Sequence, residues 1–149
     1  MTVQTNTIQS QLNLQISNWS VLYTKLHRFH WYVKGPSFFT LHAKFEELYN
    51  EAALVVDEAA ERLLAIGGQP VATMKEYLES ATLEETATET KANEMIATLV
   101  KDYTVINNSL KELAKLSEAE NDTITNDFAV GLIAKIDTHL WMLGAYLEA

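Results

Sequence analysis

The chain has 149 residues, of which 48% are hydrophobic and 21% are charged, and it carries a formal net charge of −9. This length and composition suit one packed domain, so we expect a single domain over residues 1–149 and exclude a mainly disordered protein. The absence of cysteine excludes disulfides, thiolate metal sites and cysteine nucleophiles. The acidic charge disfavours binding to the phosphate backbone of nucleic acid and suits a protein that collects cations.

Glycine and proline are scarce, and they separate long segments in which apolar residues recur every three or four positions, as in helices. The first segment predicts a helix over residues 6–33, which ends before Gly35. The second predicts a helix over residues 37–66, which ends before Gly67 and Gly68. The sequence therefore begins with two long amphipathic helices joined by a tight turn.

Two more long helices are expected after an extended connection. Residues 74–78 are compatible with two helical turns inside this connection. Thr82 and Glu85 have the spacing of a capping box, which predicts a third long helix over residues 83–116, and Asp122 can cap a fourth. The sequence thus predicts an all-α, ferritin-like four-helix bundle with a short extra helix in the long connection between the second and third helices.

Side chains that can bind a metal lie on otherwise apolar helix faces. His30 is central in the apolar stripe of the first helix, where a histidine is more often a hydrogen-bonded core residue than a ligand. His42 and Glu46 are four positions apart on the second helix, so they can chelate a cation or form a surface hydrogen bond. Asp57 and Glu61 repeat this spacing and can bind a cation or lie at the solvated edge of the helix.

The length of the second helix decides how these residues can cooperate. His42 and Asp57 are separated by about 22 Å at a rise of about 1.5 Å per residue, whereas a metal ligand lies roughly 2 Å from its ion. His30 and His42 flank a tight turn and can meet, but the carboxylates of the same chain cannot join them. A second copy related by a two-fold axis would bring its Asp57 and Glu61 to these histidines and create two identical sites.

The nature of the ligands indicates which metal such a site would take. Two imidazoles with two or three carboxylates suit Fe(II). A di-iron site inside one bundle is disfavoured, because such sites use Glu-x-x-His pairs and none of the four histidines has a glutamate three positions before it.

Three blocks of sequence carry a family resemblance: residues 27–36 (HRFHWYVKGP), residues 38–42 (FFTLH) and residues 57–62 (DEAAER), followed by Gly67-Gly68. They resemble the Dps-type miniferritins, the family of DNA-binding proteins from starved cells within the ferritin-like superfamily. The resemblance extends over essentially the whole chain and implies a hollow homo-oligomer, a dodecamer, with ferroxidase sites at its two-fold interfaces. By that pattern one subunit supplies His30 and His42, and its neighbour supplies Asp57 and Glu61.

The resemblance also implies the chemistry. The family oxidises Fe(II), with hydrogen peroxide preferred over oxygen, and stores ferric oxide, which protects against oxidative damage; iron carries the redox step. The family pattern makes Glu46 a metal ligand or near-ligand, Glu46 and Glu47 nucleation residues, Asp122 and Asp127 pore residues, and Trp31 the aromatic beside the site. The alternative roles are helix capping for Asp122 and packing for Trp31.

Two other functions compete with the ferroxidase cage. Some relatives compact DNA through lysine-rich tails, but residues 1–24 and the last four residues contain no lysine or arginine. Twelve chains of charge −9 would carry about −108, so we expect DNA to be repelled. The third possibility is a helical bundle with structural histidines, which would form a small oligomer without iron chemistry.

No segment is expected to enter a membrane, because the longest apolar runs have about five residues and a membrane span needs about 20. The first basic residue is Lys25, so the basic region of a signal peptide is missing and we expect a cytoplasmic protein.

Overall fold

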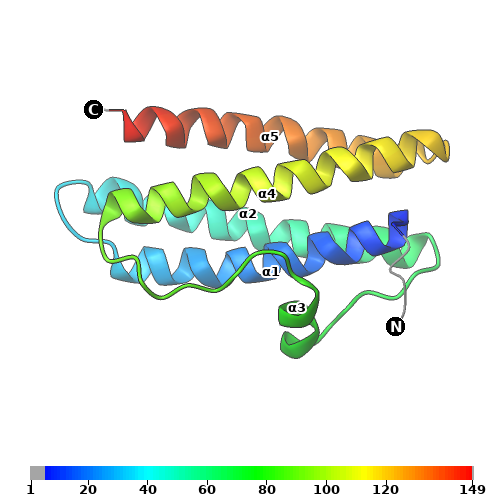
Figure 1. The fold of residues 1–149 in the computed structure, drawn as a ribbon, viewed down its shortest axis with the longest axis horizontal. Coiled ribbons are helices and arrows are strands. Elements are labelled where there is room, and N and C mark those ends of the chain that lie inside the picture. The colour runs from blue at the N-terminus through cyan, green and yellow to red at the C-terminus, as the bar shows by residue number, and fades with distance from the viewer. Residues whose placement is uncertain (1–5, 149) are drawn as a thin grey trace.

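Five helices account for most of residues 6–148, the part of the chain that the computed structural model describes. They are α1 (Ile8–Tyr32), α2 (Phe38–Ala65), α3 (Met74–Ser80), α4 (Ala92–Ala119) and α5 (Thr123–Leu147), and no strand occurs among these residues. Figure 1 shows the four long helices side by side, with α3 outside the bundle in the connection between α2 and α4. The predicted four-helix bundle with a short extra helix is confirmed.

Glycines make the sharp reversals at the ends of the first two helices. Gly35, in the turn between α1 and α2, has φ 103°, and Gly67, just after α2, has φ 87°. Residues with a side chain rarely adopt such positive φ values, so glycine is required at both positions. The helix ends predicted before these glycines are confirmed, and the short first turn makes α1 and α2 antiparallel (Figure 1).

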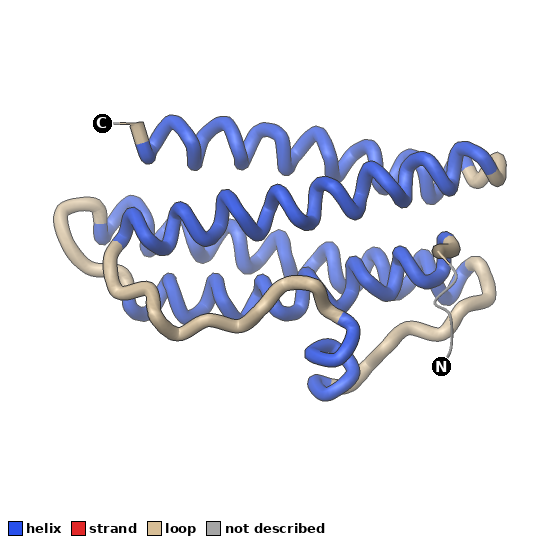
Figure 2. Tube along the Cα trace, in the orientation of Figure 1, coloured by secondary structure: helices blue, strands red, loops and turns tan. Residues whose placement is uncertain are grey.

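The start of the third long helix differs from the prediction. α4 begins at Ala92 rather than at residue 83, and the capping box expected at Thr82 does not form. Residues 82–91 instead cross the bundle as an extended segment, which we call the strap (Figure 2). Threonine occupies positions 82, 86, 88 and 90 of the strap, and its β-branched side chain lowers helix propensity.

Three polar side chains of α1 hold the strap in its extended form. Asn18 Oδ1 accepts hydrogen bonds from the backbone N–H groups of Thr82 at 2.8 Å and Leu83 at 3.2 Å. Lys25 and Arg28 donate to backbone carbonyls farther along the strap, at residues 84, 87 and 89. These long-range partners replace the hydrogen bonds that a helix would supply, so α1 decides the conformation of the strap.

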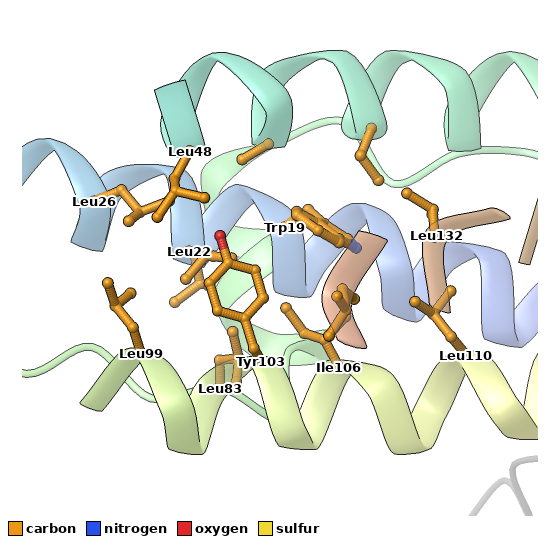
Figure 3. Packing of buried hydrophobic residues seen from close by; sticks show 14 of the residues in the cluster. Trp19, Leu22, Leu26, Leu48, Leu83, Leu99, Tyr103, Ile106, Leu110 and Leu132 are labelled. Atoms are coloured by element: carbon orange, nitrogen blue, oxygen red, sulfur yellow. The ribbon is translucent and has the colours of Figure 1, made fainter. Parts of the chain in front are cut away.

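The apolar stripes of the long helices meet in one core, part of which Figure 3 shows. Trp19, Phe29, Phe45 and Tyr103 are its largest fully buried side chains. The rings of Trp19 on α1 and Tyr103 on α4 meet edge to face, with their centroids 6.2 Å apart. Burial of one large apolar side chain stabilises a fold by about 1.5–3 kcal/mol, so this packing holds α1 firmly against the bundle.

The last helix leaves part of its apolar surface outside the core. Among the described residues α5 alone is long and apolar enough to cross a membrane, but core helices of soluble proteins meet the same criterion. It packs on α4 and contributes Leu132, Ile136 and Leu143 to the core, while the side chain of Trp141 is 70% exposed. We interpret α5 as a bundle helix whose outer apolar face is suited to contact another subunit.

Candidate metal centre

The first half of the candidate site is a pair of stacked imidazoles at the turn between α1 and α2. The rings of His30 and His42 lie 3.7 Å apart with an interplanar angle of 14°. His30 Nδ1 is 2.6 Å from the carbonyl oxygen of His42, and His42 Nδ1 is 2.8 Å from the carbonyl oxygen of His30. The structure therefore brings together the two histidines that the sequence placed on either side of a tight turn.

These reciprocal contacts fix the tautomer of both rings. A carbonyl oxygen can only accept a hydrogen bond, so each Nδ1 carries the proton and donates it. In the neutral imidazole the lone pair is then on Nε2, which is the atom that can bind a metal. His30 and His42 therefore present two oriented nitrogen donors, which fits a first-row divalent metal such as Fe(II).

Glu46 lies beside this pair, one turn after His42 on α2. Its Oε1 atom is 3.9 Å from His30 Nε2, and its side chain is 54% exposed. The neighbouring Glu47 is 69% exposed and forms an ion pair of 3.3 Å with Lys44, so part of its negative charge is offset. The carboxylate of Glu46 can reach a cation at the imidazoles, whereas Glu47 adds diffuse negative charge to the surface.

Trp31, which the family pattern places beside the site, belongs to a group of stacked rings next to His30 whose other members, His27 and Tyr49, were not identified from the sequence. The imidazole of His27 is stacked between the ring of Tyr49 at 4.0 Å and that of Trp31 at 5.0 Å, and the edge of Tyr49 meets His30 at 5.3 Å. The spacing of Tyr23, His27 and Trp31, four positions each, is the signal that could have revealed this ring stack on one face of α1. Trp31 itself is 67% exposed, so it does not pack in the core of its own chain.

The ring stack changes the proton affinities of two of its members. Burial, followed by the electrostatic influence of the neighbouring His30, lowers the pKa of His27 from its usual value. Desolvation of the phenol, followed by the negative charge of Glu46, raises the pKa of Tyr49. The phenol thus stays protonated at neutral pH and can donate its hydroxyl hydrogen to Glu46, at 3.3 Å.

The second half of the candidate site lies more than halfway along α2. Asp57 and Glu61 are both exposed and have no hydrogen-bond or ion-pair partner within residues 6–148. Leu54 and Leu64 lie on the same face of the helix and are 64% and 59% exposed. Two free carboxylates among exposed leucines are the pattern of a surface that another molecule covers.

One chain does not assemble a complete metal site. Among residues 6–148 no group of three or more histidine, aspartate or glutamate side chains could hold a metal ion. His42 lies in the first turns of α2, whereas Asp57 and Glu61 lie in its second half, so the two halves remain at different levels of this helix. The role of Asp57 and Glu61 as metal ligands stays a prediction that requires a second subunit.

The acidic residues predicted to line a pore have different environments. Asp122 is the N-cap of α5, where its carboxylate accepts hydrogen bonds from Thr125, and it also pairs with Arg62 at 3.0 Å. Desolvation raises the pKa of Asp122, but the hydrogen bonds and the Arg62 charge outweigh it, so the pKa is lowered. Asp127 is exposed. Asp122 thus performs the capping role that was its alternative, and the pore role of both residues stays a prediction.

Comparison with known proteins agrees with this fold. The family model described as Ferritin-like domain matches residues 9–149. The chain is 52% identical over 137 residues to "DNA protection during starvation protein 2" of Bacillus anthracis, covering 92% of this chain and 94% of the relative. It is 50% identical over 136 residues to "General stress protein 20U" of Bacillus subtilis, covering 91% and 94%.

Solved structures show the same relationship. Dps from Staphylococcus aureus superposes with a TM-score of 0.93 at 46% identity and covers 95% of both chains. Dps from Listeria monocytogenes superposes with a TM-score of 0.94 at 39% identity, covering 98% of this chain and 96% of the other. The chain therefore belongs to the ferritin-like family and is a Dps-type miniferritin.

Proposed function

We propose that this protein is an iron-oxidising and iron-storing cage. Twelve subunits enclose a cavity, Fe(II) is oxidised at the two-fold boundaries between subunits, and ferric oxide is stored inside. Two Fe(II) ions give two electrons to one molecule of hydrogen peroxide, which takes up two protons and leaves as two molecules of water; oxygen is the alternative oxidant. Fe(II) and peroxide are consumed together, and the protein thereby protects the cytoplasm against oxidative damage.

The observation that carries this proposal is the division of the ligands into two halves that cannot meet within one chain. His30 and His42 use Nδ1 for hydrogen bonds to backbone carbonyls at one end of α2, which leaves Nε2 of each ring available to bind a metal. Asp57 and Glu61 expose unpaired carboxylates farther along the same helix, about 22 Å away at about 1.5 Å per residue. A neighbour related by a two-fold axis reverses the direction of α2, so it can bring its carboxylates to the histidines of the first chain.

The ligands explain why such a boundary would favour oxidation. Neutral Nε2 atoms of His30 and His42 bind Fe(II) without adding charge. The carboxylates of Asp57 and Glu61 add negative charge, which stabilises Fe(III) more than Fe(II) and so favours loss of an electron. Before iron binds, the α1–α2 turn holds the two histidines in place, and α2 holds Asp57 and Glu61.

Residues outside the ligand set complete the proposal. Glu46 adds a carboxylate beside His30, and Glu46 and Glu47 attract ferric ions to the surface where mineral starts to grow. Asp122 and Asp127 guide Fe(II) into the cage at a pore. Trp31, exposed at the end of the ring stack, lies next to the site and can give an electron to it. The acidic charge of the chain, −9, favours cation entry at each step.

A complementation experiment tests whether the site spans two chains. A variant with His30→Ala and His42→Ala is mixed with a variant carrying Asp57→Ala and Glu61→Ala, and the mixture is dissociated and reassembled. We expect each variant alone to be inactive and the mixture to regain part of the peroxide-driven Fe(II) oxidation, because one site of a mixed boundary has all four ligands. If the mixture stays as inactive as its components, the shared site is excluded.

The competing function is compaction of DNA by direct binding. The name of the Bacillus anthracis relative refers to DNA protection, but about −108 charges on a twelve-subunit cage would repel DNA. We propose that this chain protects DNA by removing Fe(II) and peroxide. A gel-shift experiment with metal-free protein at physiological salt is expected to show no complex, and a stable band shift would favour the competing function.

A further inference from the structure

Tyr49 connects the two helices that build the histidine half of the site. It lies on α2, one turn after Glu46, and its hydroxyl donates a hydrogen bond to Glu46 Oε1 at 3.3 Å. The same Oε1 atom is 3.9 Å from His30 Nε2. The carboxylate oxygen that faces the imidazole is therefore the oxygen that Tyr49 holds.

Glu46 has little else to keep it in place. Its side chain is 54% exposed, and Tyr49 is its one hydrogen-bond donor among the described residues. An exposed glutamate with three side-chain torsions samples several rotamers in the absence of a partner. The hydroxyl of Tyr49 is thus the group that restricts the carboxylate to the side of His30.

Tyr49 is itself fixed by rings that belong to α1. Its ring lies 4.0 Å from that of His27 in a stacked arrangement, and it meets Tyr23 at 5.9 Å and His30 at 5.3 Å edge to face. A phenol ring has only two side-chain torsions, so three ring contacts leave its hydroxyl little freedom. The helix that carries His30 therefore also determines where the Tyr49 hydroxyl lies.

From these contacts we infer that Tyr49 is a positioning residue, which holds the Glu46 carboxylate next to His30 Nε2 so that both can bind one divalent cation. The inference rests on the proposed function and adds to it a residue that touches neither iron nor peroxide. Glu46 Oε2 has no partner within residues 6–148, so it remains open to the cation while Tyr49 holds Oε1. Hydrogen-bond partners that orient metal ligands typically change metal affinity by about 10–100-fold.

Tyr49→Phe tests the inference, because it removes the hydroxyl and keeps the ring in its stack. Tyr23→Phe is the matched control, since it removes a nearby phenol hydroxyl that makes no hydrogen bond to Glu46. The first readout is the conformation of Glu46 in metal-free crystal structures of the assembled protein and its variants. The second is the affinity for Co(II), followed by its visible absorption, in the wild-type and Glu46→Ala backgrounds.

We expect one Glu46 conformer in the wild type and in Tyr23→Phe, and several in Tyr49→Phe. Tyr49→Phe should weaken Co(II) binding by about 10-fold or more, and this loss should vanish in the Glu46→Ala background, because Tyr49 acts through Glu46. The inference would be overturned if Tyr49→Phe left the Glu46 conformer unchanged or left the Co(II) affinity unchanged. It would also be overturned if Tyr49→Phe weakened Co(II) binding equally in the Glu46→Ala background. A wild-type protein that binds Co(II) but does not oxidise Fe(II) would contradict the proposed function alone.

Discussion

The imidazoles of His30 and His42 hold each other through backbone atoms, with Nδ1-to-carbonyl distances of 2.6 and 2.8 Å. Because the acceptors are backbone carbonyls, replacing one side chain leaves the hydrogen bond of the other ring in place. We expect His30→Ala and His42→Ala each to slow peroxide-driven Fe(II) oxidation by at least about 10-fold, since one oriented imidazole remains. The double variant should lose the activity, as measured by the absorbance of the ferric product.

His139→Asn provides the control for these histidine variants. His139 lies on α5, where its Nε2 is 2.9 Å from Glu51, away from the imidazole pair. Its replacement should leave Fe(II) oxidation unchanged. If His30→Ala oxidises iron as fast as this control, the imidazole pair is not part of the site.

The buried ion pair between Lys25 and Asp102 ties α1 to α4. Its charged atoms are 2.6 Å apart, and the two side chains are 4% and 7% exposed. Burial raises the pKa of Asp102, and Lys25 opposes this rise by its hydrogen bond and charge. Lys25→Met leaves a buried carboxylate without its partner, so we expect a loss of about 3–5 kcal/mol in the free energy of unfolding.

Chemical denaturation at equal protein concentrations measures this loss, because assembly makes apparent stability depend on concentration. Replacing both residues, with Lys25→Met and Asp102→Leu, should restore most of the stability, since no charge then remains buried without a partner. A Lys25→Met protein as stable as the wild type would show that the pair does not hold the two helices together.

Asp122 should make stability depend on pH in the acid range. Its pKa in the folded protein is lowered from the ordinary 3.8, so the folded state favours the charged carboxylate. The resulting stabilisation is fully present above the ordinary pKa and is lost as the pH falls through the lowered folded pKa. Asp122→Asn keeps a good helix cap but cannot titrate. At neutral pH the wild type should have a higher free energy of unfolding than Asp122→Asn, and this difference should shrink below about pH 4. A difference that does not change with pH would show that titration of Asp122 does not affect stability.

The leucines beside the carboxylate half should be covered when the protein assembles. Leu54 and Leu64 are 64% and 59% exposed in the single chain. If these leucines lie at a subunit boundary, Leu54→Glu with Leu64→Glu would bury charge there, so the proposed cage of about 200 kDa, twelve times 16.8 kDa, should dissociate into smaller species. Light scattering after size exclusion measures the mass. The control is Asn108→Glu, at an exposed position of α4, which should leave the mass of the assembly unchanged. If the variant with both leucines replaced keeps the full mass, the α2 face that carries Leu54 and Leu64 lies outside the subunit interfaces.

The bundle could be predicted from the sequence because its helix ends are decided locally. Gly35 and Gly67 occupy backbone conformations that other residues avoid, and Asp122 caps the helix that it precedes, so the signal and its effect are neighbours in the chain. The strap could not be predicted in this way. Its backbone is held by Asn18 and the other α1 side chains, about 60 residues earlier, and the local capping-box pattern at Thr82 conveyed none of this.

The candidate site shows the same limit. The i,i+4 spacing identified His42 with Glu46 and placed His30 across the turn, because turn and helix geometry determine these neighbours. Tyr49 was missed, since its importance comes from rings on another helix and from a hydroxyl whose direction only the packed structure defines. Asp57 and Glu61 were selected by their spacing, and the role proposed for them needs histidines of another chain, which one sequence and one subunit do not contain.

The most direct measurement is an anomalous diffraction map at the iron absorption edge, from crystals of the assembled protein soaked with Fe(II) without oxygen. We expect iron at the boundary between two subunits, bound by His30 and His42 of one subunit and by Asp57 and Glu61 of the other. Iron held entirely by residues of one chain, or no iron at any subunit boundary, would contradict it.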